Sequence, residues 1–126
     1  KFVLMSHDQN RARALGRRLA EASDEPVEET AEWYFAELMA ILKIRATRKN
    51  HVNVLQHLQG FLKNEIDSED KQELAETIDK YRIQLLPLIV PITLLRHHFR
   101  RHPHEFIDRT KYLDPHPAEL MLLNTL

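Results

Sequence analysis

The chain has 126 residues, no cysteine and only two glycines, and its formal net charge at pH 7 is −1. The lack of cysteine excludes disulfide bonds, iron–sulfur ligation by thiolates and a thiol nucleophile. Two glycines are too few for a glycine-rich phosphate loop, and a net charge near zero is not typical of nucleic-acid binders. With 43% hydrophobic and 29% charged residues, the composition indicates a globular protein, and we expect a single domain over residues 1–126.

No signal peptide is visible, and the longest nearly apolar run extends only from Leu85 to Leu95. A membrane-spanning helix needs about 20 apolar residues, so we interpret this run as buried core and expect no membrane partner. The cysteine-free composition is consistent with a cytoplasmic protein. The chain begins at Lys1 without Met, so we expect that its N-terminus has been trimmed.

Apolar residues at helical spacing predict two helices in the first third of the chain. The first helix is predicted from Val3 to Ala22, with Leu4, His7, Arg11, Leu15 and Leu19 along one face. The second is predicted from Val27 to Ile44 and begins with glutamates, which the helix dipole favours there. Its wide apolar face is formed by Val27, Ala31, Tyr34, Phe35, Leu38, Ile41 and Leu42.

A third helix is predicted from Arg48 to Asn64, with Thr47 as its N-cap. On a helical wheel His51 falls on the apolar face with Leu55, Leu58 and Leu62, while Asn53, His57, Gly60 and Asn64 share another, polar face. We expect His51 to be buried and the polar face to be available for other contacts.

A fourth helix is predicted from Glu69 to Leu85, capped by Ser68. Pro87 and Pro91 disfavour continued helix, so we expect a kink or break at residues 86–90 and a fifth helix from Pro91 to Arg101. Short helices are expected at 104–109 and 117–123, and no alternating β pattern is present. The sequence therefore predicts an all-α fold, a compact single-domain bundle of five to six helices with a proline-interrupted central apolar helix.

Cationic residues form three groups that invite a phosphate-binding interpretation, because arginine matches phosphate geometry with two hydrogen bonds. The alternative for the first group is a solvated helix end that complements its own dipole. If the fold brings two groups together, a basic groove results despite the neutral total charge. The groups are Arg96, His97, Arg100 and Arg101; Arg11, Arg13, Arg17 and Arg18; and Arg45, Arg48 and Lys49.

The histidines do not predict a metal site. His51 and His57 are six residues apart and lie on different helix faces, whereas a zinc site needs three or four converging ligands. We interpret His7 and His51 as hydrogen-bonded core residues, with the alternative that one of them, close to Tyr81 or Glu119, acts as a general base. Tyr34 and the other aromatic residues are expected mainly in the core, with base stacking as the alternative.

Four stretches of sequence resemble the YbgA-like family, a domain of unknown function, over nearly the whole chain. They are Leu4 to His7 (LMSH), His51 to Gly60 (HVNVLQHLQG), Pro87 to His97 (PLIVPITLLRH) and Tyr112 to Leu120 (YLDPHPAEL). The family occurs alone and fused to the C-terminus of domains that resemble thiouracil desulfidases. In those fusions the resemblance implies that an iron–sulfur domain acts on thiolated uracil and that the helical domain binds RNA. This chain has no cysteine, so only the RNA-binding role is carried over.

The same resemblance draws attention to the polar motif positions His7, His51, Asn53, Gln56, His57, His97, Tyr112, His116 and Glu119. Asn53, Gln56, His57, His97 and His116 lack an obvious packing role, so they are the better candidates for ligand contacts.

Our leading hypothesis is an accessory domain that binds tRNA or another structured RNA, without catalysis of its own and without a cofactor. Arg96, Arg100 and Arg101 are predicted to bind phosphates, and Arg11, Arg17 and Arg18 are predicted to make a second contact. An uncharacterised small-molecule or metal-dependent enzyme built from His7, His51, His57 and Glu119 is the first alternative. A protein-interaction module, recognisable by an exposed apolar patch, is the second.

Overall fold

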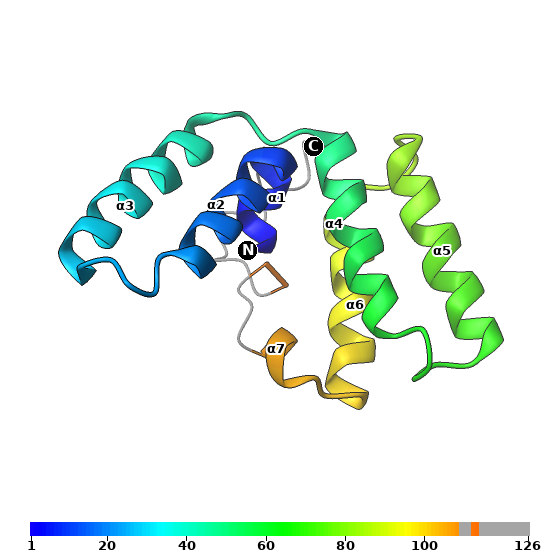
Figure 1. Cartoon of the computed structure of the whole chain (residues 1–126). Helices are drawn as coiled ribbons and strands as arrows, with labels where there is room; N and C mark the ends of the chain where they lie inside the picture. Colours follow the sequence, from blue (N-terminus) through cyan, green and yellow to red (C-terminus); the bar gives the residue numbers. More distant parts are fainter. Residues whose placement is uncertain (109–111, 114–126) are drawn as a thin grey trace.

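The structure is a computed structural model that describes residues 1–108 and 112–113, and this part of the chain is all-α (Figure 1). The all-α bundle predicted from the sequence is confirmed. The helices are α1 (Phe2–His7), α2 (Gln9–Glu21), α3 (Val27–Lys43), α4 (Arg48–Phe61), α5 (Ser68–Arg82), α6 (Ile89–Arg101) and α7 (Glu105–Asp108). None of these helices is both long enough and apolar enough to cross a membrane.

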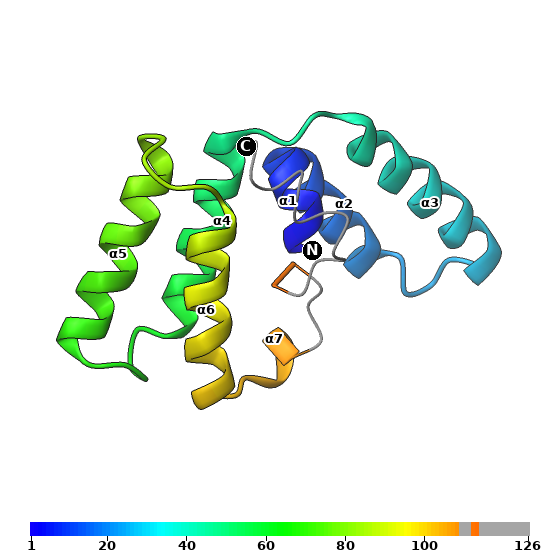
Figure 2. The ribbon, with the colours of Figure 1, turned by 180° about the vertical axis from the view of Figure 1, so that it is seen from behind.

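The short helix α1 joins the two halves of the bundle, because it packs against α2, α3 and α4. On one side, α2 and α3 lie next to each other, and α3 forms the edge of the molecule. On the other side, α5 packs on both α4 and α6, with α6 behind α4 in Figure 1 and in front of it in the reverse view of Figure 2.

The main core lies between α4, α5 and α6, where Leu55, Leu58, Leu74, Ile92 and Leu95 are fully buried. Phe2 and Met5 extend this core into α1. A second, much smaller core of Leu4, Leu15 and Ile41 holds α2 and α3 on α1. The α1–α3 half therefore has far less buried apolar surface to stabilise it than the α4–α6 half.

The first predicted helix is divided in two by Asp8. This residue has extended backbone angles (φ −157°, ψ 108°), and its carboxylate accepts a hydrogen bond from the backbone N–H of Arg11, 3.0 Å away. Asp8 thus acts as the N-cap of α2, as its short acceptor side chain allows. The prediction of one helix from Val3 to Ala22 was wrong because the apolar spacing continues across the break.

The predicted proline-interrupted helix is not present in the described residues. Instead, α5 already ends at Arg82, Pro87 lies in the connection, and Pro91 is the third residue of α6. At that position a missing N–H removes no hydrogen bond within the helix.

The N-cap of α5 is Asp67, which accepts a hydrogen bond from the N–H of Asp70, and not Ser68 as predicted. The predicted Thr47 cap of α4 is confirmed, because its hydroxyl accepts a 3.1 Å hydrogen bond from the N–H of Asn50. The helix expected at 117–123 lies outside the described residues.

Candidate nucleic-acid interface

One face of α2 presents polar and cationic side chains to solvent. Asn10, Arg13 and Arg17 follow one another at spacings of three and four residues, which places them on the same side of the helix. Within the described residues, neither Arg13 nor Arg17 has an ion pair or a side-chain hydrogen bond, and both are exposed. Two guanidinium groups are therefore available for a ligand on this face.

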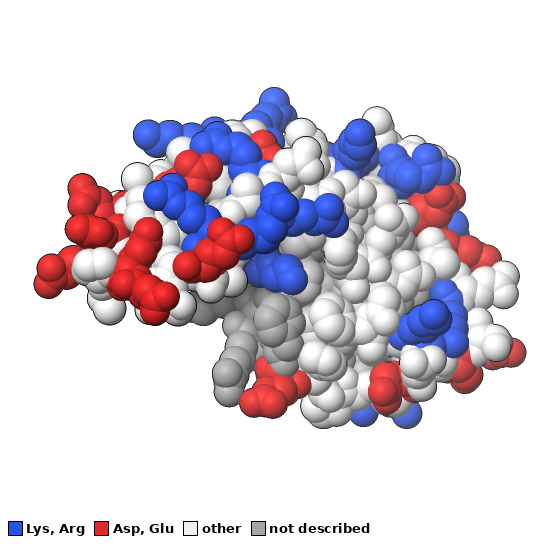
Figure 3. All heavy atoms as spheres, in the orientation of Figure 1, with Lys and Arg blue, Asp and Glu red and all other residues white. Residues whose placement is uncertain are grey.

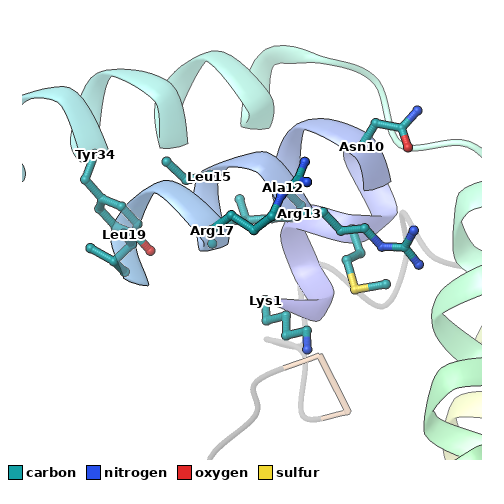
Figure 4. A pocket seen from close by; sticks show the side chains of 11 residues that line it. Lys1, Asn10, Ala12, Arg13, Leu15, Arg17, Leu19 and Tyr34 are labelled. Carbon is teal, nitrogen blue, oxygen red and sulfur yellow. The ribbon is translucent and has the colours of Figure 1, made fainter. Parts of the chain in front are cut away.

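These side chains border a cavity of about 830 Å³ between α1, α2 and α3 (Figure 4). Leu4, Met5, Leu15 and Leu19 give it an apolar lining, and Tyr34 of α3 contributes an aromatic ring beside Leu19. The polar and cationic residues that line the same cavity are Lys1, Asn10, Arg13 and Arg17. A ligand with an apolar or aromatic part and a negative group would fit this combination.

A second, polar hollow of about 360 Å³ lies where the start of α2 meets α4. Asn53, Gln56, His57 and Gly60 of α4 line it together with Gln9 of α2. The Asn53 side-chain amide donates to Oε1 of Gln9 across the two helices, at 3.1 Å. Gln56 and His57 are exposed and make no hydrogen bond within the described residues. The structure thus brings together Asn53, His57 and Gly60, which the sequence placed on one polar helix face, and adds Gln56 beside them.

Charges are segregated on the face that carries α2 (Figure 3). Lysine and arginine side chains gather over α2 and along the edge where α3 leads into α4, while acidic side chains cover the outer part of α3 and part of α5. Arg45 and Lys49 supply exposed cations near that edge. A chain with a net charge of −1 therefore still has a positive region where a polyanion can bind.

Three of the predicted phosphate-binding arginines are already engaged with other parts of the protein. Arg11 contacts Oε1 of Glu37 through Nε at 3.0 Å and Nη2 at 2.7 Å. The guanidinium of Arg18 lies over the ring of Trp33, 3.9 Å from its centroid. Arg48 donates to the backbone carbonyl of Tyr81 at 2.7 Å and lies over the ring of the same residue. Of the four arginines predicted as phosphate contacts on α2, Arg13 and Arg17 have no such engagement within the described residues.

The predicted α6 group lies elsewhere, because α6 packs on α5 and α4 and not on α2. Arg96 has an interaction within the protein, whereas Arg100 and Arg101 are exposed at the C-terminal end of the helix, where cations complement the dipole. His97 borders a separate groove between α5 and α6, and His98 is buried, which lowers its pKa. The two predicted arginine groups therefore do not form one groove.

His51 is buried in the core, and its Nδ1 lies 2.7 Å from the hydroxyl of Tyr112. Burial, together with electrostatic interactions with His7 and Arg48, lowers the pKa of His51 to about 4. Burial also raises the pKa of Tyr112 and brings that of Tyr81 to about 12. His51 is thus a neutral structural residue that fastens Tyr112 to α4.

The histidine constellation considered for an enzyme does not assemble. Nδ1 of His7 donates to the carbonyl of Ile44, which ties α1 to the end of α3. His57 lines the polar hollow, whereas His51 is buried in the core. Neither His7 nor His51 lines either cavity. His116 and Glu119 lie outside the described residues. Among the residues described, no three His, Asp or Glu side chains gather as metal ligands.

Gln9 lines the polar hollow although its sequence context did not mark it as a site residue, and Tyr34, for which base stacking was the alternative to a core position, lines the larger cavity. The spacing of Asn10, Arg13 and Arg17 marks one helix face in the sequence, so it could have selected Arg13 over Arg11. No sequence pattern could have placed Tyr34 beside α2, because that contact depends on how α3 folds back.

A family model described as "Protein of unknown function (DUF1722)" matches residues 1–117. The chain belongs to this family. It is also similar to the uncharacterized protein YbgA of Escherichia coli (strain K12), with 29% identity over 123 residues that cover 97% of this chain and 73% of that protein. The predicted YbgA-like membership is thereby confirmed. No solved structure matches the chain.

Proposed function

We propose that this DUF1722 domain binds RNA through a face formed by α2 and α4. The observation that carries the proposal is a pair of arginines, Arg13 and Arg17, that have no ion pair within the described residues and line an apolar cavity, with a polar hollow at the start of the same helix. Each of these three parts matches a different part of a nucleotide. The proposal requires no catalytic group and no cofactor.

Arg13 and Arg17 are suited to hold phosphates. Guanidinium groups bind phosphate oxygens with charge-assisted hydrogen bonds, and these two have no carboxylate among the described residues to satisfy them first. Their spacing of four residues separates them by roughly 6 Å along the helix, which is close to the distance between successive phosphates of a nucleic-acid strand. Arg45 and Lys49 extend the positive region towards α4.

The cavity beside these arginines is suited to an unstacked base. Sequence-tolerant recognition of single-stranded RNA relies on bases that leave the stack and pack on aromatic side chains. Tyr34 supplies such a ring in an otherwise apolar lining, and Leu19 lies beside it (Figure 4). A base seated there would leave its phosphate near Arg13 or Arg17.

The polar hollow is suited to the neutral edges of RNA. Gln9, Asn53, Gln56 and His57 offer amide and imidazole groups that can donate and accept hydrogen bonds. Such groups bind ribose hydroxyls and base edges, and the 2′-hydroxyl distinguishes RNA from DNA. The arginines alone would bind RNA and DNA phosphates equally well. The polar hollow is therefore the reason to favour RNA.

Titration of the chain against bulk tRNA and against duplex DNA of similar length, at two salt concentrations, tests the proposal. The double variant Arg13→Ala/Arg17→Ala is expected to weaken tRNA binding by at least about tenfold, because each lost charge-assisted contact costs on the order of 1.5 kcal/mol. The matched control is Arg100→Ala/Arg101→Ala, which removes the same charge from exposed positions on α6. We expect the control to bind tRNA within about twofold of the unmodified chain, because exposed charges away from the RNA-binding face contribute little to affinity.

Two results would overturn the proposal. One is the absence of tRNA binding at low salt. The other is the reverse ranking, in which the α6 variant loses affinity and the α2 variant keeps it. Circular dichroism of both variants checks that the fold is intact, as expected for exposed arginines that have no ion pair within the described residues.

A further inference from the structure

The outer face of α3 carries apolar side chains that nothing in the described structure covers. Phe35 is 63% exposed and Val27 is 82% exposed, and Met39 and Leu42 are also exposed. With Ala31 they form a stripe at spacings of four, four, four and three residues, which we call the α3 stripe. A continuous apolar stripe of this length on a surface helix is typical of an interaction site.

The stripe is exposed because α3 packs on one side only. Tyr34, Leu38 and Ile41 face α1 and α2 in the small core, and no helix lies on the opposite side of α3 in either view (Figures 1 and 2). Spacings of three and four residues keep the stripe on one side of the helix. One further helix laid along α3 would bury it.

The charges beside the stripe differ at its two ends. Glu28 and Glu32 lie beside its N-terminal part, and Lys43 lies at its C-terminal end on the same edge of the helix. A parallel copy of α3 would place glutamates against glutamates. An antiparallel copy centred near Phe35 would place Glu28 against the lysine end of the other helix.

We propose that two copies of this chain associate through their α3 stripes in an antiparallel pair, with the two-fold axis at Phe35. A single two-fold axis pairs the apolar residues of the stripe across the two copies. Ala31 and Met39 lie four residues on either side of Phe35, so the small side chain of one copy faces the large side chain of the other. Glu28 lies seven residues before Phe35 and Lys43 eight residues after it, which brings unlike charges together at both ends.

The partner is a second copy because apolar pattern and charge pattern share this centre of symmetry, as an isologous interface requires. The acidic edge of α3 excludes a polyanion from the same surface. A single helix pair buries less than the roughly 1,600 Å² of a standard interface, so the dimer is expected to dissociate on dilution. This association uses a different face from the proposed RNA site and is independent of it.

Sedimentation equilibrium over a range of protein concentrations provides the first test. The unmodified chain is expected to shift from monomer to dimer as its concentration rises. Phe35→Glu places two carboxylates at the axis and is expected to leave the chain monomeric throughout. The control is Leu85→Glu, at a residue that is 66% exposed and lies beyond the end of α5, and it should associate like the unmodified chain.

Charge reversal tests the antiparallel register. Glu28→Lys alone and Lys43→Glu alone are each expected to weaken association, because each creates like-charge contacts at both ends of the pair. The double variant Glu28→Lys/Lys43→Glu is expected to restore it. The two residues are fifteen positions apart on one helix, so this rescue would arise between copies and not within one.

A crosslinking experiment traps the dimer covalently, so that a weak association can still be detected. The chain has no cysteine, so Phe35→Cys introduces a single thiol on the axis, and a short bis-maleimide should join two copies efficiently. Leu85→Cys is the control and should crosslink poorly. A chain that is monomeric at every concentration, a dimer that Phe35→Glu leaves intact, or equal crosslinking of the two cysteine variants would overturn the proposal.

Discussion

His51 shows how a single buried polar residue fixes the end of the described chain. It lies on the apolar face of α4, is 3% exposed, and is held by the hydroxyl of Tyr112, sixty-one residues later in the sequence. Its Nε2 has no hydrogen-bond partner within the described residues, and neither has the hydroxyl of Tyr81. Protonation of His51 would add a charge in this confined space, close to Arg48, and no carboxylate of the described residues forms an ion pair with it.

The lowered pKa of His51 makes stability depend on pH. In the unfolded chain the pKa of His51 is near 6.5, and in the folded chain it is about 4. The unfolded state therefore binds the proton first, so stability is complete above pH 6.5 and falls as the pH drops from 6.5 towards 4. At about 1.4 kcal/mol for each pH unit, the loss amounts to about 3 kcal/mol over this window.

Urea unfolding at pH 7 and pH 4.5 measures this effect. We expect the free energy of unfolding to fall between these pH values by on the order of 2 kcal/mol more in the unmodified chain than in His51→Gln, which cannot take up the proton. The buried His98 contributes a loss of the same sign to both proteins, since its pKa is also lowered. An identical pH dependence of the two proteins would show that His51 does not titrate as described.

At the scale of elements, the end of α5 is set by a residue in a left-handed conformation. Gln84 has φ 69°; its N–H bonds the carbonyl of Tyr81, and the N–H of Leu85 bonds the carbonyl of Lys80. This pair of bonds is a Schellman motif, in which glycine normally occupies the position of Gln84. Arg48 also donates to the carbonyl of Tyr81, so α4 helps to cap α5.

Gln84→Gly is expected to raise stability. A side chain at positive φ costs on the order of 1 kcal/mol relative to glycine, which outweighs the greater freedom of glycine in the unfolded chain. The matched control is Gln72→Gly in the interior of α5, which should lower stability by roughly 1 kcal/mol. Thermal or urea unfolding of both variants decides the matter, and destabilisation of Gln84→Gly would contradict the role given to this turn.

The sequence predicts helices well because their faces repeat, and it predicts their ends less well. The period that includes Leu4, Arg11 and Leu15 runs across Asp8 without a gap, so only the local cap, and not the apolar pattern, distinguishes α1 from α2. Conversely, the sequence predicted one wide apolar face for α3, yet Phe35 is exposed because no helix of the described residues covers it. Periodicity identifies a face but not what packs against it.

On the scale of the whole molecule, the two halves of the bundle have different characters. The α4–α6 half holds most of the core, whereas the α1–α3 half carries the free arginines, the larger cavity and the α3 stripe. The sequence located three cationic groups, but it could not show that Glu37, Trp33 and Tyr81 would engage one arginine each. These contacts join residues far apart in the chain, so only the tertiary structure separates available cations from engaged ones.

The salt dependence of tRNA binding tests the central claim most directly. Each phosphate contact adds roughly 0.7 to 0.9 to the slope of log K against log salt concentration, because binding releases counterions. If Arg13 and Arg17 hold phosphates, Arg13→Ala/Arg17→Ala should lower that slope by about 1.5, while Arg100→Ala/Arg101→Ala leaves it unchanged. An equal slope for the unmodified chain and the α2 variant, or binding that salt does not affect, would contradict an RNA-binding face on α2.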